Sequence, residues 1–231
     1  MPYFNPKNDA SWDLPATQID IWRFPLTGET NWISVLNEQE RERAHRFYFK
    51  RHARRFIQAH GIMREILANY LNQHPADVLL TTDANGKPCL KGSDLCFNLS
   101  HSNEYALLAV GRQYALGVDL EVFTSRSYQG VAEHMFSPEE CKKLKTAPEE
   151  LACAIFFSIW SQKEALIKAC GLGLRYPTKD FSVQALAPNT YEVYDSLHEQ
   201  HWAMYPFFPL PGYAGALCYH QSCNTLRFFS Y

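Results

Sequence analysis

Two acidic residues interrupt the apolar stretch ALGVDLEVF, residues 115–123. Asp119 and Glu121 are two positions apart, so on a strand both carboxylates lie on the same face. An exposed pair of this kind is common, because water reduces the repulsion to below about 1 kcal/mol. A partly buried pair needs a cation, and oxygen ligands without histidine or thiolate suit Mg²⁺ or Mn²⁺. The spacing alone fits either arrangement.

A second group of reactive side chains lies in FFSIWSQKEALIKACGLGL, residues 156–174. Trp160, Glu164 and Lys168 are spaced four apart and therefore form one stripe on a helix, with Lys163 at its edge. The same spacing is typical of a solvent-exposed Glu–Lys pair beside a half-buried tryptophan. Spacing alone does not choose between a surface pair and a functional stripe.

Positive charge that could bind an anion is concentrated before residue 60. Residues 41–55 carry a single acid, Glu42, against Arg41, Arg43, Arg46, Lys50, Arg51, Arg54 and Arg55. A solvated helix face would have the same composition. Lys87 follows an Asn-Gly turn, and Ser100-His101-Ser102 ends a short strand where hydroxyls and an imidazole can approach an anion. Adjacent strand residues point to opposite faces, so no Ser100–His101 catalytic pair is expected.

The first half of the chain must position these residues with helices and short strands. Asn37 and Glu40 have the spacing of a helical capping box, and an apolar stripe from Phe56 to Leu71 predicts the next helix, which we expect Pro75 to end. Asn85-Gly86 can supply the left-handed positions of a hairpin turn. Alternation predicts strands at 18–24, 97–99, 105–110 and 116–121.

The second half repeats this order. Ser137-Pro138-Glu139-Glu140 predicts a capped helix start, and a longer helix is expected over 149–170, with Gly171 after its end. Strands are expected at 181–186, 191–194, 202–205, 213–219 and 226–229. The chain is therefore expected to be α+β, with an N-terminal half at 1–113, a C-terminal half at 114–231, and a cleft between them.

Composition excludes several other classes. The chain has 231 residues and a net charge of −2, which gives no general case for nucleic-acid binding. The seven cysteines contain no CxxC pair, which fits reduced thiols in a cytoplasmic protein. We expect neither a secretory signal nor a membrane span.

Five motifs occur in a recognisable order: GKP at 86–88, FNLSHS at 97–102, GVDLE at 117–121, FSxxE at 136–140 and WxxKEAxxKxxGxGL at 160–174. Together they resemble the 4′-phosphopantetheinyl transferases of the monomeric, surfactin-synthetase-activating type. The similarity covers about residues 36–181, and the WxxKEA form is typical of the subgroup with broad carrier-protein use. The resemblance implies a pseudo-twofold fold, in which each half has a long helix packed on a short-stranded sheet.

The resemblance also implies roles for individual residues. Asp119, Glu121 and Glu164 are expected to bind Mg²⁺, with Mn²⁺ as an alternative. The residues expected to bind coenzyme A are Arg43, Arg55, Lys87, Ser100, His101, Lys163 and Lys168. The catalytic group is expected to comprise Asp119 and Lys168, with Glu164 as the first candidate for general base and Glu140 as the second.

The implied reaction transfers 4′-phosphopantetheine from coenzyme A to a serine of an apo acyl- or peptidyl-carrier protein, releasing 3′,5′-ADP. We expect a monomer that binds neither nucleic acid nor membrane, and a basic and apolar lip that suits an acidic carrier domain. Two alternatives use the same residue types: a metal-dependent phosphohydrolase or nuclease, and a non-catalytic module that binds coenzyme A or carrier protein.

Overall fold

The two halves of the chain repeat one order of elements: a strand, a long helix and two further strands. The computed structural model describes residues 1–125 and 128–231. The first half contains β2 (Gln18–Pro25), α2 (Lys50–Leu71), β5 (Leu95–Ser102) and β6 (Tyr105–Arg112). The second contains β7 (Leu116–Val122), α5 (Glu149–Cys170), β9 (Gln200–Phe207) and β10 (Tyr213–His220). In each half the last strand pairs antiparallel with the first, which gives the orders β2-β6-β5 and β7-β10-β9. The predicted α+β pair of similar halves is confirmed.

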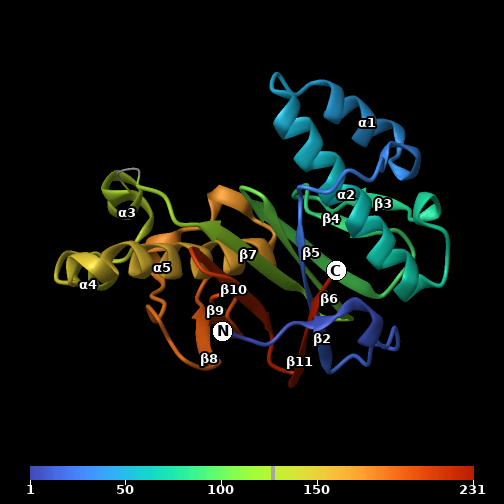
Figure 1. Cartoon of the computed structure of the whole chain (residues 1–231). Coiled ribbons are helices and arrows are strands. Elements are labelled where there is room, and N and C mark those ends of the chain that lie inside the picture. Colours follow the sequence, from blue (N-terminus) through green and yellow to red (C-terminus); the bar gives the residue numbers. More distant parts are fainter. Residues whose placement is uncertain (126–127) are drawn as a thin grey trace.

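The two sheets lie between the two long helices (Figure 1). One face of the first sheet buries Trp22, Phe24 and Leu108 against α2. Its other face shares a core with the second sheet, in which Ile19 and Ile21 accompany Val118 and Leu120. The far face of the second sheet packs against α5. The layers are therefore helix, sheet, sheet and helix, and β5 and β7 are edge strands at the seam.

The remaining elements are short. They are β1 (Asn5–Pro6), α1 (Glu38–His45), β3 (Leu80–Thr82), β4 (Pro88–Leu90), α3 (Gln129–Met135), α4 (Pro138–Lys145), β8 (Tyr191–Asp195) and β11 (Thr225–Ser230), with short 3₁₀ turns at Lys7–Asp9, Ile33–Val35, Pro75–Asp77, Gly173–Arg175 and Thr178–Asp180. Within the described ranges, no helix has the length and apolarity needed to cross a membrane.

The last strand crosses the expected boundary between halves at residue 113. β11 lies parallel between β1 and β2, so it completes the first sheet, whose order is β1-β11-β2-β6-β5. Arg227 on β11 forms an ion pair of 2.7 Å with the fully buried Asp20 on β2. Figure 1 shows this red strand beside the blue N-terminal segment. The last strand of segment 114–231 therefore belongs to the sheet of the first half.

The basic segment 41–55 spans two helices, since α1 ends at His45 and α2 begins at Lys50. Two local predictions differ from the structure. Residues 181–186 form no strand, since main-chain N–H groups there donate to side chains: Val183 to Glu140 and Leu186 to Ser158. At the 85–86 turn, only Gly86 has a positive φ, 87°.

Candidate active site

The face of β7 that meets α5 carries Gly117 and the two acids. Alternation places Leu116, Val118 and Leu120 in the core between the sheets, so the odd-numbered residues point the other way. A Cβ atom at Gly117 would clash with the Ala165 carbonyl oxygen and the Ala169 nitrogen of α5. The glycine thus allows the helix to approach the strand closely, which brings the helical stripe to the strand acids.

Asp119 is buried, and only one of its two carboxylate oxygens has bonding partners among the described residues. Its Oδ1 lies 2.5 Å from Lys168 Nζ and accepts a hydrogen bond of 2.9 Å from Ser100 Oγ. Lys168 Nζ also lies 2.8 Å from Ser100 Oγ, which closes a triangle of three polar groups. Asp119 Oδ2 is buried and has no hydrogen-bond partner among the described residues. A buried carboxylate oxygen without a partner is costly unless a cation or a donor reaches it.

Glu121 and Glu164 are the other two carboxylates of this group. Glu121 accepts hydrogen bonds of 2.9 Å from Trp160 Nε1 and 3.2 Å from Ser102 Oγ. Burial, followed by the charge of Asp119, raises the pKa of Glu121 to about 7. Burial and then Asp119 likewise raise the pKa of Glu164 to about 7. The chain therefore gathers more negative charge here than its own groups neutralise, which favours a bound cation.

Side chains of the neighbouring edge strand hold β7 in place. The N–H groups of Val118, Leu120 and Val122 donate to side-chain oxygens on β5 rather than to a main-chain partner. The acceptors are Asn98 Oδ1 at 2.8 Å, Ser100 Oγ at 3.3 Å and Ser102 Oγ at 3.1 Å. This role of Asn98 and Ser102 was not predicted from the sequence. The only signal was their alternation in FNLSHS, whose even positions share one face of a strand.

A cleft of about 530 Å³ lies between β5 and the helices α1 and α2. Arg43, Phe56, His60, Asn98 and His101 are among the residues that line it. The pKa of His101 is lowered by burial and then by neighbouring cationic groups that include His60 and Lys168. Arg43 contributes an exposed guanidinium to this cleft, and the acid Glu40, which pairs with His60 and Arg64, also lines it.

Arg55 and Lys87, two more of the predicted coenzyme A ligands, also have protein partners. Arg55 donates to Glu104 Oε1 from Nη2 at 2.5 Å and from Nε at 3.1 Å. Lys87 Nζ donates to the main-chain oxygens of Leu116 at 2.8 Å and Ala169 at 3.2 Å. Arg43 is exposed on the cleft wall, with its guanidinium 5.2 Å from the Phe56 ring centroid. Arg43 is thus better placed than Arg55 to meet a ligand.

Glu140 and Lys163 do not join the site. They form a buried ion pair of 2.9 Å, in which both side chains are at most 2% exposed. Lys163 Nζ also donates to the carbonyl oxygens of Thr178 and Phe181, and Glu140 Oε1 accepts from the Val183 N–H. This burial corrects the expectation that Lys163 binds coenzyme A and that Glu140 is a candidate base. The pair instead holds segment 178–183 to α4 and α5.

The comparisons with known proteins cover both halves. The family model described as 4′-phosphopantetheinyl transferase, N-terminal, matches residues 22–113, and that of the 4′-phosphopantetheinyl transferase superfamily matches residues 115–218. The 4′-phosphopantetheinyl transferase HetI of Nostoc sp. (strain PCC 7120) is 38% identical over 170 residues, which are 70% of this chain and 72% of that protein.

Other relatives cover more of the chain. The 4′-phosphopantetheinyl transferase Sfp of Bacillus subtilis (strain 168) is 30% identical over 199 residues, 84% of this chain and 87% of that protein. The mouse L-aminoadipate-semialdehyde dehydrogenase-phosphopantetheinyl transferase is 26% identical over 220 residues, 82% of this chain and 71% of that protein. With both family models matched and these identities, the chain belongs to the 4′-phosphopantetheinyl transferases, a class of enzymes.

Proposed function

We propose that this enzyme transfers the 4′-phosphopantetheine group of coenzyme A to a serine hydroxyl of an apo acyl- or peptidyl-carrier protein. The observation that carries the proposal is the cluster of Asp119, Glu121, Glu164 and Lys168, in a chain of this family whose cleft is lined by Arg43 and His101. The serine oxygen would form a bond to a phosphorus of the coenzyme A pyrophosphate. The bond from that phosphorus to the bridging oxygen would break, and 3′,5′-ADP would leave.

The three carboxylates fit a divalent cation. Asp119 Oδ2 is buried without a partner among the described residues, and the donors offered are all oxygens. Such a set suits Mg²⁺, with Mn²⁺ as an alternative, and not a metal that prefers thiolate. When bound, the cation would neutralise charge on the pyrophosphate oxygens. Asp119, Glu121 and Glu164 are the residues that would hold it.

The cationic side chains would bind the rest of coenzyme A. Lys168 Nζ lies between Asp119 and Ser100, where it can also donate to a pyrophosphate oxygen. His101 and Arg43 line the cleft and would meet the phosphate at the adenosine end. Donors fixed before the reaction stabilise developing negative charge without reorganising.

Glu164 is the candidate general base. In the metal-free chain, burial and the charge of Asp119 raise the pKa of Glu164 to about 7, which makes its carboxylate more basic than that of an exposed glutamate. Glu164 would take the serine proton as the oxygen attacks. Because the carrier supplies the nucleophile, the transferase needs no serine of its own.

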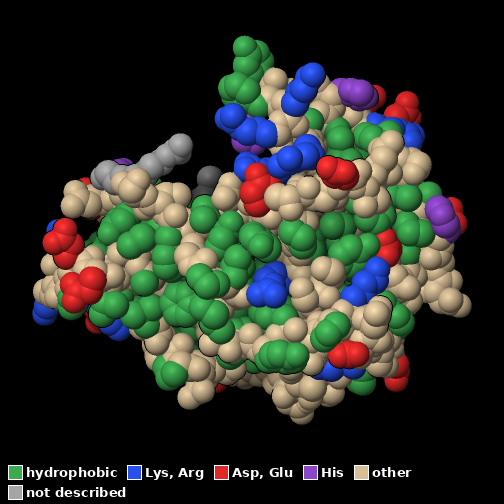
Figure 2. All heavy atoms as spheres, viewed as in Figure 1, with side chains coloured by type: hydrophobic (Ala, Val, Ile, Leu, Met, Phe, Trp, Pro, Cys, Tyr) green, Lys and Arg blue, Asp and Glu red, His purple; other side chains and the backbone are tan. Residues whose placement is uncertain are grey.

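The carrier protein would dock on the turn between α1 and α2. Tyr48 and Phe49 in this turn are 91% and 49% exposed. Arg46, Lys50 and Arg51 flank them, and all three are exposed. Figure 2 shows hydrophobic side chains at the tip of the α1–α2 region, with lysine and arginine side chains around them. This combination suits an acidic partner with an apolar contact.

A transfer assay tests the proposed function. The enzyme is incubated with coenzyme A, Mg²⁺ and several apo carrier proteins, and each carrier is weighed by mass spectrometry. We expect at least one carrier to gain the mass of one phosphopantetheinyl group and 3′,5′-ADP to form in equal amount. Unchanged carriers with hydrolysed coenzyme A would indicate a phosphohydrolase, and unchanged carriers with intact coenzyme A would indicate a binding module.

A further inference from the structure

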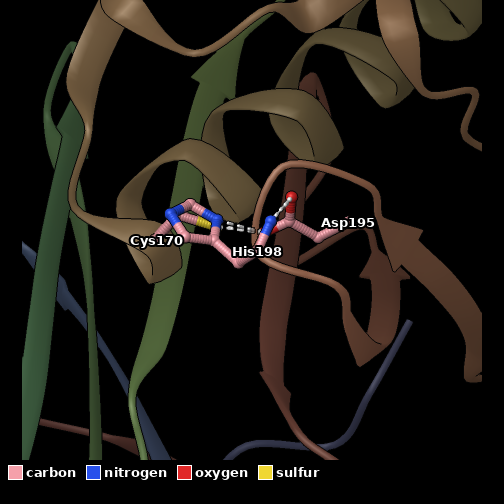
Figure 3. A group of neighbouring side chains, drawn as sticks. All are labelled: Cys170, Asp195 and His198. Atoms are coloured by element: carbon pink, nitrogen blue, oxygen red, sulfur yellow. Dashed lines mark hydrogen bonds and ion pairs between the residues drawn. The ribbon is translucent and has the colours of Figure 1, made fainter.

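A second group of side chains with metal-binding chemistry lies at the C-terminal end of α5. Cys170 is the last residue of α5, Asp195 is the last residue of β8, and His198 lies in the turn that leads to β9. Figure 3 shows the three side chains converging from the helix end and the hairpin. One ligand atom from each residue lies within 4.8 Å of the other two.

The contacts in this cluster all converge on one carboxylate. Asp195 is fully buried, and its Oδ2 lies 2.7 Å from His198 Nδ1 and accepts from Cys170 Sγ at 3.2 Å. Its Oδ1 is used separately, by the Tyr176 hydroxyl at 2.5 Å and the Leu197 N–H at 3.0 Å. These bonds fix the carboxylate, so Oδ2 is held between a thiol and an imidazole.

We propose that Cys170 Sγ, Asp195 Oδ2 and His198 Nδ1 form a zinc site. Thiolate and imidazole are the ligands that Zn²⁺ favours over the hard cations, and a carboxylate is a common third ligand. Ligand atoms around a tetrahedral zinc lie roughly 3.3–3.6 Å apart, so the cluster needs only small movements to enclose the ion. A thiolate and a carboxylate together balance the charge of Zn²⁺.

The proton balance of binding is simple. Burial and the neighbouring Asp195 raise the pKa of Cys170, so the metal-free thiol keeps its proton. On binding, the thiol proton leaves to solvent, and the neutral imidazole carries its proton on Nε2 instead of Nδ1. The His198 side chain is 38% exposed, which gives the ion a path of entry and leaves room for water as a fourth ligand.

This site is chemically distinct from the acid cluster. Asp119, Glu121 and Glu164 offer oxygen alone, whereas the Cys170 group offers sulfur and nitrogen. A zinc ion here would tie the end of α5 to the β8–β9 hairpin. Because α5 also carries Glu164 and Lys168, the ion would stabilise the element that supplies part of the active site.

Cobalt(II) is the direct probe, since a thiolate ligand gives it a near-ultraviolet charge-transfer band that oxygen ligands do not. Co²⁺ is added to the metal-free full-length chain, and Zn²⁺ is then added to displace it. We expect the band to appear with one equivalent, to vanish with Zn²⁺, and to be lost in Cys170→Ser. In His198→Ala the Co²⁺ affinity should fall about 100-fold.

Matched variants complete the test. Cys153→Ser and His201→Ala remove a partly exposed thiol and a histidine of the same hairpin, and both should keep the band. Asp119→Asn should keep it too, which separates this site from the acid cluster. Circular dichroism verifies that every variant is folded. No charge-transfer band in the folded wild-type chain, or a band that survives Cys170→Ser, would overturn the proposal.

Discussion

At the scale of single residues, the three acids have unequal surroundings. Asp119 holds Ser100 and Lys168 with one oxygen while its other oxygen is buried without a partner among the described residues. Glu121 is held by Trp160 and Ser102, yet its pKa is raised to about 7. These environments favour cation binding most strongly at a pH at which the carboxylates are ionised. Protons and metal therefore compete for the same oxygens.

The stability of the metal-free chain should therefore depend on pH through Glu121. A carboxyl whose folded-state pKa is raised contributes its stability below the unfolded value of 4.5 and loses it as pH rises through about 7. We expect Glu121→Gln to be more stable than wild type at about pH 8 and to lose this advantage at about pH 4. Thermal unfolding in a chelator measures the difference.

Two comparisons make that experiment decisive. Mg²⁺ should raise the unfolding midpoint of the wild type at about pH 8 and have little effect on it at about pH 5. Glu139→Gln, at an exposed acid of α4, should show no such pH dependence. A stability difference between wild type and Glu121→Gln that stays constant across this range would contradict the account.

Residue types and spacing were enough to predict that Asp119 and Glu121 share a face, and that Glu164 and Lys168 share a stripe. They could not separate Lys163 from Lys168. Both are lysines of one helix segment, and only packing shows that Glu140 and segment 178–181 bury the first. The use of the three acids as metal ligands and of Lys168 as a substrate ligand rests on the family resemblance and stays a prediction.

At the scale of elements, the seam between β5 and β7 depends on side-chain acceptors. In Asn98→Ala the Val118 N–H loses its acceptor while it remains buried. We expect the free energy of unfolding to fall by about 1–3 kcal/mol. Cys96→Ala, two positions earlier on the same face, removes only a weak bond to the Asp94 carbonyl and serves as control. Equal stability of the two variants in urea unfolding would show that the Asn98 side chain does not stabilise the contact between β5 and β7.

The approach of α5 to β7 depends on Gly117. Gly117→Ala places a methyl group against the main chain of α5, which cannot yield as a flexible side chain could. We expect a loss of about 1–3 kcal/mol or more in unfolding free energy, together with weaker Mg²⁺ binding. Gly130→Ala in α3 has open space around it and should lower neither the unfolding free energy nor the Mg²⁺ affinity. Wild-type metal affinity in Gly117→Ala would show that this contact does not position the acids.

Sequence periodicity predicted the bounds of the helices and strands better than it predicted which elements lie beside one another. The bounds of α5 and the start of α4 follow from caps and a hydrophobic stripe, which are local signals. The placement of β11 beside β2 is not local, because it joins residues 207 positions apart, such as Arg227 and the buried Asp20. The segment 181–186 has the alternation of a strand, but its main-chain bonds go to side chains of α4 and α5 and to Tyr191.

At the scale of the whole molecule, the acids lie at the seam of two similar halves, and the exposed α1–α2 turn extends from the first half. We expect Tyr48→Ala to raise the KM for carrier protein roughly tenfold while kcat stays unchanged. The reason is that this side chain, 91% exposed, would contact the partner and not coenzyme A. Tyr3→Ala, at another strongly exposed tyrosine, is the control. A fall in kcat with no change in KM would place Tyr48 in a different role.

We propose that the carboxylates at the seam hold the cation for transfer, and a carrier-loading assay of their variants measures this role. Carrier loading from coenzyme A and Mg²⁺ is followed by mass spectrometry for wild type, Asp119→Asn and Glu164→Gln, with Glu139→Gln as control. We predict that wild type and the control load the carrier fully. The other two should remain folded and lose about 10²–10⁴-fold in rate. Loading at the wild-type rate by both Asp119→Asn and Glu164→Gln would show that transfer does not need these carboxylates to hold the cation.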